Sequence, residues 1–417
     1  MAEIKPAIES FAKIKVIGVG GSGGSAINRM IKSRIKGVEF IAANTDVQAL
    51  HNSHAQKKIQ LGKSITRGLG SGMNPDIGKQ SAEESQNELR EVLNGADMVF
   101  VTCGLGGGTG SGASPVIADI ARDCGALTVA VVTKPFTFEG VQRNEIADNA
   151  FKDLSEQVDT IINIPNDRVL NVIDKKTSLL DAFEAVDDVL RQGVQSISEV
   201  ITVPGLVNVD FADVKSIMQN TGSALMGIGT ATGENRVVTA AKQAISSPLL
   251  EMSIEGAKGV LFTITGGSDL GMQEFDEAAK VITSNADSNA KVIFGTVIDD
   301  EMKDEVKVCV IATGFDAVHR KTEQKVETSR SASSGGVDFA KGEKSSPSTK
   351  PSFFSKALKD SITVRDRDGA KGEDVAPAFS KKKIADLEEV KKPKRQMAGA
   401  DSEDDLEIPA FIRRKLP

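Results

Sequence analysis

The sequence predicts an α/β protein built on a parallel sheet, and three observations support this prediction. Apolar runs that are typical of buried strands alternate with helical patterns over much of the chain. Two glycine-rich stretches, at residues 18–26 and 104–112, each follow such a run and lead into a helix. Because parallel strands place their carboxyl ends at one edge of a sheet, we expect both stretches to face one ligand.

The stretch GLGGGTGSG at residues 104–112 joins an apolar run at 98–102 to a helical pattern with Pro115 near its first turn. Glycine lets the backbone approach a ligand and point several N–H groups at it. The helix start adds partial positive charge, and we expect Thr109 and Ser111 to add hydroxyl donors. The stretch predicts a phosphate-binding loop. A flexible linker is the alternative, but linkers rarely separate a core strand from a helix.

The earlier stretch follows a predicted strand at residues 13–19 and precedes a helix predicted at about 26–35. It contains G-x-G-x-x-G from Gly18, which matches a dinucleotide fingerprint. A second strand, at 39–43, ends in Asn44-Thr45-Asp46, where an acid could hold a ribose hydroxyl. This part of the chain alone is therefore as compatible with NAD as with a nucleoside triphosphate.

The second glycine loop favours a triphosphate, because a chain of two or three phosphates needs more than one phosphate-binding loop. Neither stretch has the G-x-x-x-x-G-K-[ST] spacing of a P-loop NTPase. Between them, the composition of residues 66–72 (TRGLGSG) is that of a mobile loop that could cover a ligand. We therefore expect a nucleotide site closed by this loop.

Composition excludes several classes of protein. A length of 417 residues allows two or three domains, and a net charge of −7 argues against a general nucleic-acid binder. The three cysteines are far apart and show no metal-ligand spacing, so we expect each to be a small buried group in a reducing cytoplasm. The sequence shows no apolar stretch of the roughly 20 residues that span a bilayer, and no signal peptide.

Four motifs together resemble the tubulin/FtsZ family of GTPases, in the form found in FtsZ. They are GGGTGSG at 106–112, VGGSGGSA at 19–26, TFEGVQR at 137–143 and NVDFAD at 208–213. Ser22 departs from the glycine that the family usually has. The resemblance covers residues 13–316 and recurs in the last dozen residues. It implies a tubulin-like fold: a Rossmann-type parallel-sheet GTPase domain, a long central helix, a smaller α/β domain and a disordered tail.

The resemblance also implies that the ligand is GTP or GDP with Mg²⁺, without a metal site made by the protein alone. The residues of the two glycine loops and the second strand that it assigns to nucleotide binding are Gly21, Ser22, Gly23, Gly24, Ser25, Asn44, Gly107, Gly108, Thr109 and Gly110.

Five further residues are candidates for contact with the nucleotide. Glu139 and Arg143 could equally form a local ion pair on a solvated face. Phe183 could stack on a base, and Asp187 could accept two N–H bonds from a guanine edge; the alternative is a core phenylalanine and a solvated acid. The resemblance implies the nucleotide roles, including one for Asn166, which follows a strand predicted at 160–164.

A long amphipathic helix is predicted at residues 178–201, with apolar residues spaced by three and four. About 24 residues of helix span roughly 36 Å, so acids beyond its far end cannot reach the nucleotide at its start. Asp210 and Asp213 are either solvated turn acids or act on another molecule. The resemblance implies the second role: with Asn208, they enter the nucleotide site of the next subunit and polarise the attacking water.

We expect six parts in the chain: an arm at 1–12, a GTP-binding domain at 13–177, and the central helix with the catalytic loop at 178–221. An α/β domain at 222–316, a disordered linker at 317–403 and a peptide at 404–417 follow. The peptide, DDLEIPAFIRRKLP, has an apolar cluster followed by basic residues, which is typical of a docking motif. The resemblance implies that it binds division proteins and FtsA-like membrane anchors.

The resemblance thus implies a cytoplasmic GTPase that polymerises head to tail into protofilaments and scaffolds the bacterial division ring at midcell. We expect it to insert into no membrane and to bind no nucleic acid. Two alternatives stay open. A dinucleotide oxidoreductase is supported only by the fingerprint at Gly18, and a nucleotide-binding structural protein without turnover is disfavoured by Asp210 and Asp213.

Overall fold

The computed structural model describes residues 12–171, 177–203, 205, 207, 209–250, 253–299 and 302–315. Residues 1–11 of the predicted arm, the whole of the predicted linker and the predicted C-terminal peptide lie outside this part of the chain.

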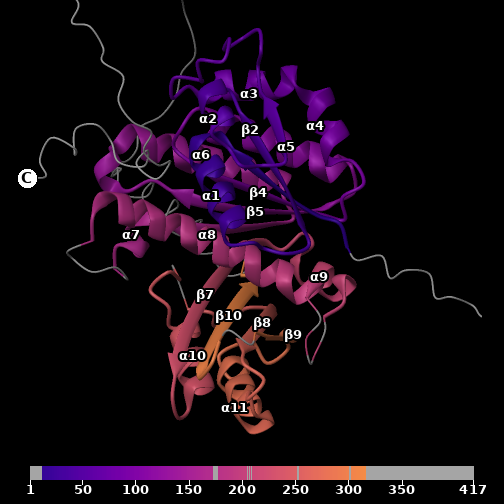
Figure 1. Cartoon of the computed structure of the whole chain (residues 1–417), viewed down its shortest axis with the longest axis vertical. Helices are drawn as coiled ribbons and strands as arrows, with labels where there is room; N and C mark the ends of the chain where they lie inside the picture. The colour runs from indigo at the N-terminus through magenta and orange to yellow at the C-terminus, as the bar shows by residue number, and fades with distance from the viewer. Residues whose placement is uncertain are drawn as a thin grey trace, which may run out of the picture. The chain divides into compact units, whose positions relative to one another are not determined.

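A mixed sheet of ten strands runs through the described residues. Its parallel half is made of β1 (Ile14–Val19), β2 (Val38–Asn44), β3 (Lys57–Gln60), β4 (Met98–Gly104), β5 (Leu127–Lys134) and β6 (Thr160–Pro165). The other half is made of β7 (Gly222–Thr232), β8 (Gly259–Gly266), β9 (Lys291–Ile298) and β10 (Glu305–Thr313). The spatial order is β3-β2-β1-β4-β5-β6-β7-β10-β8-β9 (Figure 1). Strand β10 is antiparallel to both of its neighbours.

The two halves of the sheet join between β6 and β7, which pair in parallel over residues 160–162 and 222–224. The carbonyl of Asp159, just before β6, accepts from the N–H groups of Thr221 and Gly222 at 2.9 and 3.1 Å. The buried Asp159 carboxylate also accepts from Thr128 N at 3.0 Å. The sequence led us to expect two α/β domains, but it did not predict that they share one sheet.

Helices cover both faces of the parallel half. One face packs against α1 (Gly20–Lys32), α8 (Leu179–Thr202) and α9 (Phe211–Met218). The other packs against α3 (Pro75–Glu84), α4 (Gln86–Leu93), α5 (Thr109–Asp123) and α6 (Val141–Gln157). Successive strand residues point to opposite faces of the sheet. Val16 is therefore buried on the face covered by α1, α8 and α9, and Ile17 on the face covered by α3 to α6. Burial on both faces explains why these strands are continuous apolar runs.

Helix α8 packs against both halves of the sheet. Val186, Leu190 and Val194 are buried in a core that contains β-strand residues of the parallel half and also Leu261 and Ile311 of the second half. The helix begins after Ser178, whose hydroxyl accepts from Asp181 N at 3.2 Å. On the other side of the second half, α10 (Arg236–Ile245) and α11 (Met272–Thr283) enclose a separate core.

Several element boundaries differ from the predictions. Helix α1 begins at Gly20 rather than near residue 26, and α5 begins at Thr109, which places Pro115 in its second turn. Cys103 and Cys309 are buried as expected, and burial raises the pKa of the Cys103 thiol to about 12. Cys124, in contrast, is half-exposed. None of the described helices is long and apolar enough to cross a bilayer.

Candidate nucleotide site

A cavity of about 360 Å³ lies at the carboxyl ends of β1, β4 and β5 and reaches the start of α8. We call it the main pocket. Most of the predicted nucleotide-binding residues line it: Gly21, Ser22, Gly107, Gly108, Thr109, Gly110, Glu139, Arg143, Asn166, Phe183 and Asp187. The fold therefore brings together residues that are up to 166 positions apart in the sequence, from Gly21 to Asp187.

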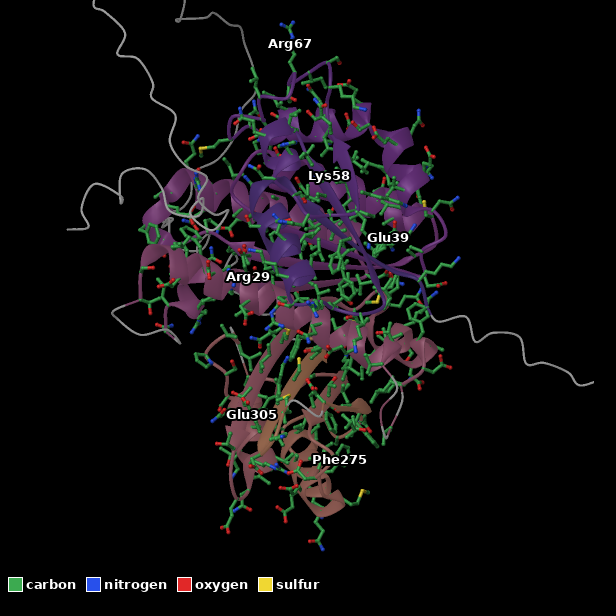
Figure 2. All side chains as sticks on the ribbon, viewed as in Figure 1. Arg29, Glu39, Lys58, Arg67, Phe275 and Glu305 are labelled. Carbon is green, nitrogen blue, oxygen red and sulfur yellow. The ribbon has the colours of Figure 1, made fainter. Side chains whose placement is uncertain are left out.

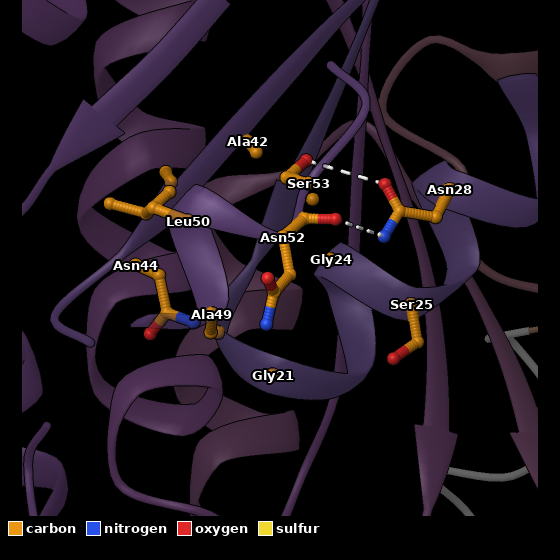
Figure 3. Close-up of a pocket in the computed structure, with 13 residues that line it drawn as sticks. Gly21, Gly24, Ser25, Asn28, Ala42, Asn44, Ala49, Leu50, Asn52 and Ser53 are labelled. Carbon is orange, nitrogen blue, oxygen red and sulfur yellow. Dashed lines mark hydrogen bonds between the residues drawn. The ribbon is translucent and has the colours of Figure 1, made fainter. Parts of the chain in front are cut away.

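Three predicted residues line a neighbouring cavity of about 160 Å³ instead. Gly24, Ser25 and Asn44 lie there, on the side of α1 that faces β2 (Figure 3). Figure 3 also shows Asn28 on the lining of this cavity, with hydrogen bonds to the Asn52 carbonyl and the Ser53 hydroxyl at 3.4 Å each. The two cavities share Gly21. The structure thus divides the predicted phosphate residues between two hollows on either side of the start of α1.

Gly23 has a packing role. A Cβ atom at this position would lie 2.5 Å from the Thr102 carbonyl oxygen and 2.9 Å from the Gly18 carbonyl carbon. Only glycine lets α1 approach β1 and β4 this closely. Gly23 therefore sets the position of the helix start. It is not among the described residues that line either cavity.

Two helix starts meet at the main pocket. Among the described residues, no side chain caps the first turn of α1 or of α5, so backbone N–H groups at both starts are available to a ligand. The starts are adjacent, because a Cβ atom on Gly20 would lie 3.1 Å from Gly110 N. Each start carries partial positive charge. Together they form a binding site for a group with several negative charges, such as a polyphosphate.

Ser22, the departure from the family pattern, ties the two glycine loops together. Its hydroxyl accepts from Gly104 N at 2.9 Å. A glycine at position 22 could not make this bond. The serine therefore adds a link between the first turn of α1 and the end of β4.

The two hydroxyls of the second glycine loop mainly order the loop itself. Ser111 is buried, accepts from Gly106 N at 2.9 Å and does not line the main pocket, so its donation to a ligand stays a prediction. Thr109 lies on the main pocket, but its hydroxyl is within 2.7 Å of that of Thr45 and 2.9 Å of that of Ser71. Three hydroxyls, from the residue after β2, from α5 and from the loop at 66–72, thus share one network.

Ser71 was missed as a site residue, although its loop was recognised as a possible cover. It lines the main pocket and closes over Gly108, where a Cβ atom would lie 2.3 Å from the Ser71 hydroxyl oxygen. Figure 2 shows Arg67 extending outward from the same loop. A serine in a glycine-rich segment is an ordinary turn residue, so its sequence carries no signal of this contact.

The base end of the main pocket is formed by α8 and by the short α7 (Asn166–Val169). Asn166 is 6% exposed, and its Oδ1 atom has no hydrogen-bond partner among the described residues. Phe183 is 42% exposed, with its ring edge-to-face against Phe136 at 5.4 Å. Burial raises the pKa of Asp187 to about 6, although Arg29 opposes this shift. An aromatic face and two acceptors therefore line this end.

Glu139 and Arg143 form the ion pair that their spacing allows, with 2.5 Å between Oε2 and Nη1. Glu139 also accepts from Phe136 N at 2.9 Å. Both side chains line the main pocket. The ion pair and contact with a ligand are therefore compatible.

The two predicted catalytic acids lie beyond the far end of α8. Asp210 caps α9, accepting from Ala212 N at 3.4 Å, and Asp213 lies in the first turn of that helix. Figure 1 shows α7 and α9 near opposite ends of α8, and 24 residues of helix span about 36 Å. Within the described residues, neither acid lines the main pocket. Asn208 lies outside the described residues.

This fold and this site define an α/β protein with a pocket at the carboxyl ends of its parallel strands, lined by two helix starts and by a central helix. The profile of the GTPase domain of the tubulin/FtsZ family matches residues 13–174, and that of the C-terminal domain of the FtsZ family matches residues 222–316. The chain belongs to the FtsZ family, a branch of the tubulin/FtsZ GTPases. The family resemblance and the fold class predicted from the sequence are thereby confirmed.

Solved structures agree with this assignment. An FtsZ dimer from M. jannaschii is 43% identical and superposes with a TM-score of 0.72, over 74% of this chain and 90% of that one. CetZ2 from Haloferax volcanii, solved as a GTPγS-bound protofilament, is 20% identical with a TM-score of 0.64, over 77% of this chain and 99% of that one. The second likeness concerns the fold alone.

Proposed function

We propose that the chain polymerises head to tail and hydrolyses GTP at the contact between subunits, as the scaffold of the division ring at midcell in the cytoplasm. One observation supports this most directly: Asp210 and Asp213 lie beyond the far end of α8, and neither lines the pocket in their own chain that suits a nucleotide. Acids that act on that nucleotide must come from another copy.

The residues of the main pocket suit GTP. The uncapped starts of α1 and α5 suit its phosphates, and Phe183 offers a ring to the base. Asp187 in its ionised form accepts two N–H bonds from a guanine edge, and adenine presents no such pair of donors there. The unpartnered Asn166 Oδ1 is a further buried acceptor for a ligand donor. We assign Gly21, Ser22, Gly107, Gly108, Thr109 and Gly110 to the phosphates.

Mg²⁺ would neutralise phosphate charge when it is bound. No cluster of three or more acidic, histidine or cysteine side chains in the described residues could hold a metal ion alone. This suits an ion that is held mainly by phosphate oxygens and water. In the proposed mechanism the two glycine loops fix the phosphates, and Asp210 and Asp213 of the next subunit orient the attacking water. Asn208 is proposed to assist them.

Exposed apolar side chains support self-association. Phe138 and Val141 flank the pocket residues Glu139 and Arg143 and are 64% and 74% exposed, and Leu69 on the covering loop is 88% exposed. Near the acids, Val207 is 40% exposed. Apolar groups near both ends of α8 suit a contact between two different surfaces, and such a contact extends into a filament. The relatives solved as a dimer and as a protofilament are consistent with this.

We further propose that residues 404–417 dock division proteins and FtsA-like membrane anchors, and that residues 317–403 act as a linker. The mixed apolar and basic sequence of the peptide supports this proposal.

The alternative of a dinucleotide enzyme relied on an acid that could hold a ribose hydroxyl. The carboxylate of Asp46 instead caps α2 (Val47–His51) by accepting from Gln48 N at 2.8 Å, so this alternative is disfavoured.

The proposed function is tested by GTP turnover over a protein concentration series, together with electron microscopy in GTP, GDP or NADH. We expect filaments with GTP, and turnover per molecule that rises as filaments form. A chain lacking residues 404–417 should behave in the same way but fail to bind an FtsA-like anchor. Filaments that are independent of nucleotide, or turnover that does not change with concentration, would contradict the proposal.

GTP affinity should depend on pH through Asp187. Its pKa of about 6 lies above the ordinary 3.8, so the folded protein holds an extra proton between these values. The stability of the free protein should therefore fall as the pH rises through this window. GTP affinity should do the reverse: it rises as the carboxyl ionises near pH 6 and is constant above pH 7. Calorimetric titration from pH 5 to 8 measures it.

Asp187→Asn is the matched control for this experiment, because the amide keeps the size of the side chain and cannot ionise. We expect it to bind GTP at least about tenfold more weakly at pH 7.5, since a charged hydrogen-bond acceptor is lost, and to lose the pH dependence near 6. An unchanged pH profile would show that another group controls it.

A further inference from the structure

The loop between α8 and α9, which carries Asp210, is held by strand β9 of the second half of the sheet. Val207 N donates to the Thr296 hydroxyl at 2.9 Å, and Thr296 N donates to the Val207 carbonyl at 3.2 Å. Thr296 is 4% exposed. Strand β9 is the last strand of the sheet, so an outward N–H group of its edge is paired here with the loop.

Close backbone packing reinforces this pair of hydrogen bonds. A Cβ atom on Gly205 would lie 1.7 Å from the Thr296 carbonyl oxygen. A Cβ atom on Gly295 would lie 2.3 Å from Val200 Cγ2 and 3.1 Å from Val209 Cγ2. Strand and loop therefore touch at residues 205, 207 and 209, with no room for a side chain at either glycine.

These contacts end one residue before the first catalytic acid. Val209 is buried against Gly295, and Asp210 follows it directly and caps α9. A shift of β9 relative to α8 would therefore move the chain that leads into Asp210 and Asp213. The second domain contacts this loop through Thr296 and Gly295 of β9, which pack against Gly205, Val207 and Val209.

We propose that Thr296 is a positioning residue for GTP hydrolysis: its hydroxyl and backbone hold the catalytic loop so that Asp210 and Asp213 fit the pocket of the next subunit. This inference rests on the proposed function. Thr296 does not line the main pocket of its own chain, whose α-helix and strand residues come from α1, β4, α5, β5, α6, α7 and α8. Its loss should therefore reduce turnover without reducing GTP affinity.

The test compares Thr296→Val with Thr296→Ser in the full chain. Valine keeps the shape but removes the acceptor of Val207 N, whereas serine keeps the acceptor. We expect valine to lower the turnover number of assembled protein at least about tenfold, because small misplacements of catalytic groups are costly. GTP affinity should stay within about twofold of the wild type. Serine should restore turnover to within about twofold.

Thr263→Val is the matched control, because Thr263 is a buried threonine on neighbouring β8, and no hydrogen bond among the described residues ties it to the loop. It should keep normal turnover. Normal turnover in Thr296→Val would overturn the inference. So would a result in which the valine and serine variants lose turnover to the same extent and melting temperature to the same extent. Asp213→Ala run in parallel separates the two hypotheses: normal turnover in that variant would contradict the proposed function itself.

Discussion

Replacing Gly108 by alanine is expected to weaken GTP binding at least about 100-fold, or about 2.8 kcal/mol. The new Cβ atom would lie 2.3 Å from the Ser71 hydroxyl oxygen and 2.7 Å from Asn74 N. Asn74 N belongs to the backbone, so the loop or the start of α5 must move. Gly108 immediately precedes that helix, whose first N–H groups face the pocket. The phosphate-binding geometry should be lost from both sides.

Gly107→Ala provides the comparison, because no atom of the described residues lies within 4 Å of a Cβ atom there. This variant should keep the wild-type melting temperature, so any lost affinity reports contact with the ligand. Calorimetric titration with GTP, and thermal unfolding of each variant, separate the two effects. Wild-type affinity in Gly108→Ala would mean that the phosphates do not approach this loop.

The strands of the parallel half could be predicted from the sequence because they are buried on both faces. Met98 to Val101 are fully buried and form an uninterrupted apolar run. The long helix was equally visible, since α8 presents one apolar stripe to the sheet and its boundaries differ from the predicted ones by one residue at each end. In both cases one strong local pattern coincides with the tertiary burial.

The start of α1 could not be predicted, because glycine is a poor helix former. A pattern search begins the helix at the first favourable residue, Ala26, whereas in the structure the helix begins at Gly20.

The hydroxyl network of Thr45, Ser71 and Thr109 could not be predicted for another reason. It joins three segments that are distant in the sequence, and no local spacing encodes it.

The sequence left two environments open for Asp187, a solvated face or a ligand pocket. The half-buried carboxyl lies on the main pocket, and burial raises its pKa, so the structure favours the second environment. The shared sheet was hidden because the junction of β6 and β7 rests on three backbone pairs near Asp159. Backbone pairing of this kind leaves no side-chain pattern.

Asp213→Ala should lower GTP turnover at least about 100-fold, while GTP affinity remains within about twofold of the wild type. The residue lies in the first turn of α9, beyond the end of α8, and the helix from Phe183 to Thr202 alone spans roughly 28 Å. Its loss therefore leaves the pocket intact. Turnover and affinity are measured on the same preparation, and Asp210→Ala should behave in the same way.

Mixing two inactive variants tests where the acids act. Asp213→Ala has an intact pocket and a defective loop, whereas Gly108→Ala has a defective pocket and an intact loop. Neither should hydrolyse GTP alone. If the acids serve the next subunit, contacts between the two variants unite an intact pocket with an intact loop, and the mixture should regain turnover. A mixture no more active than the sum of its parts would mean that each site is complete within one chain.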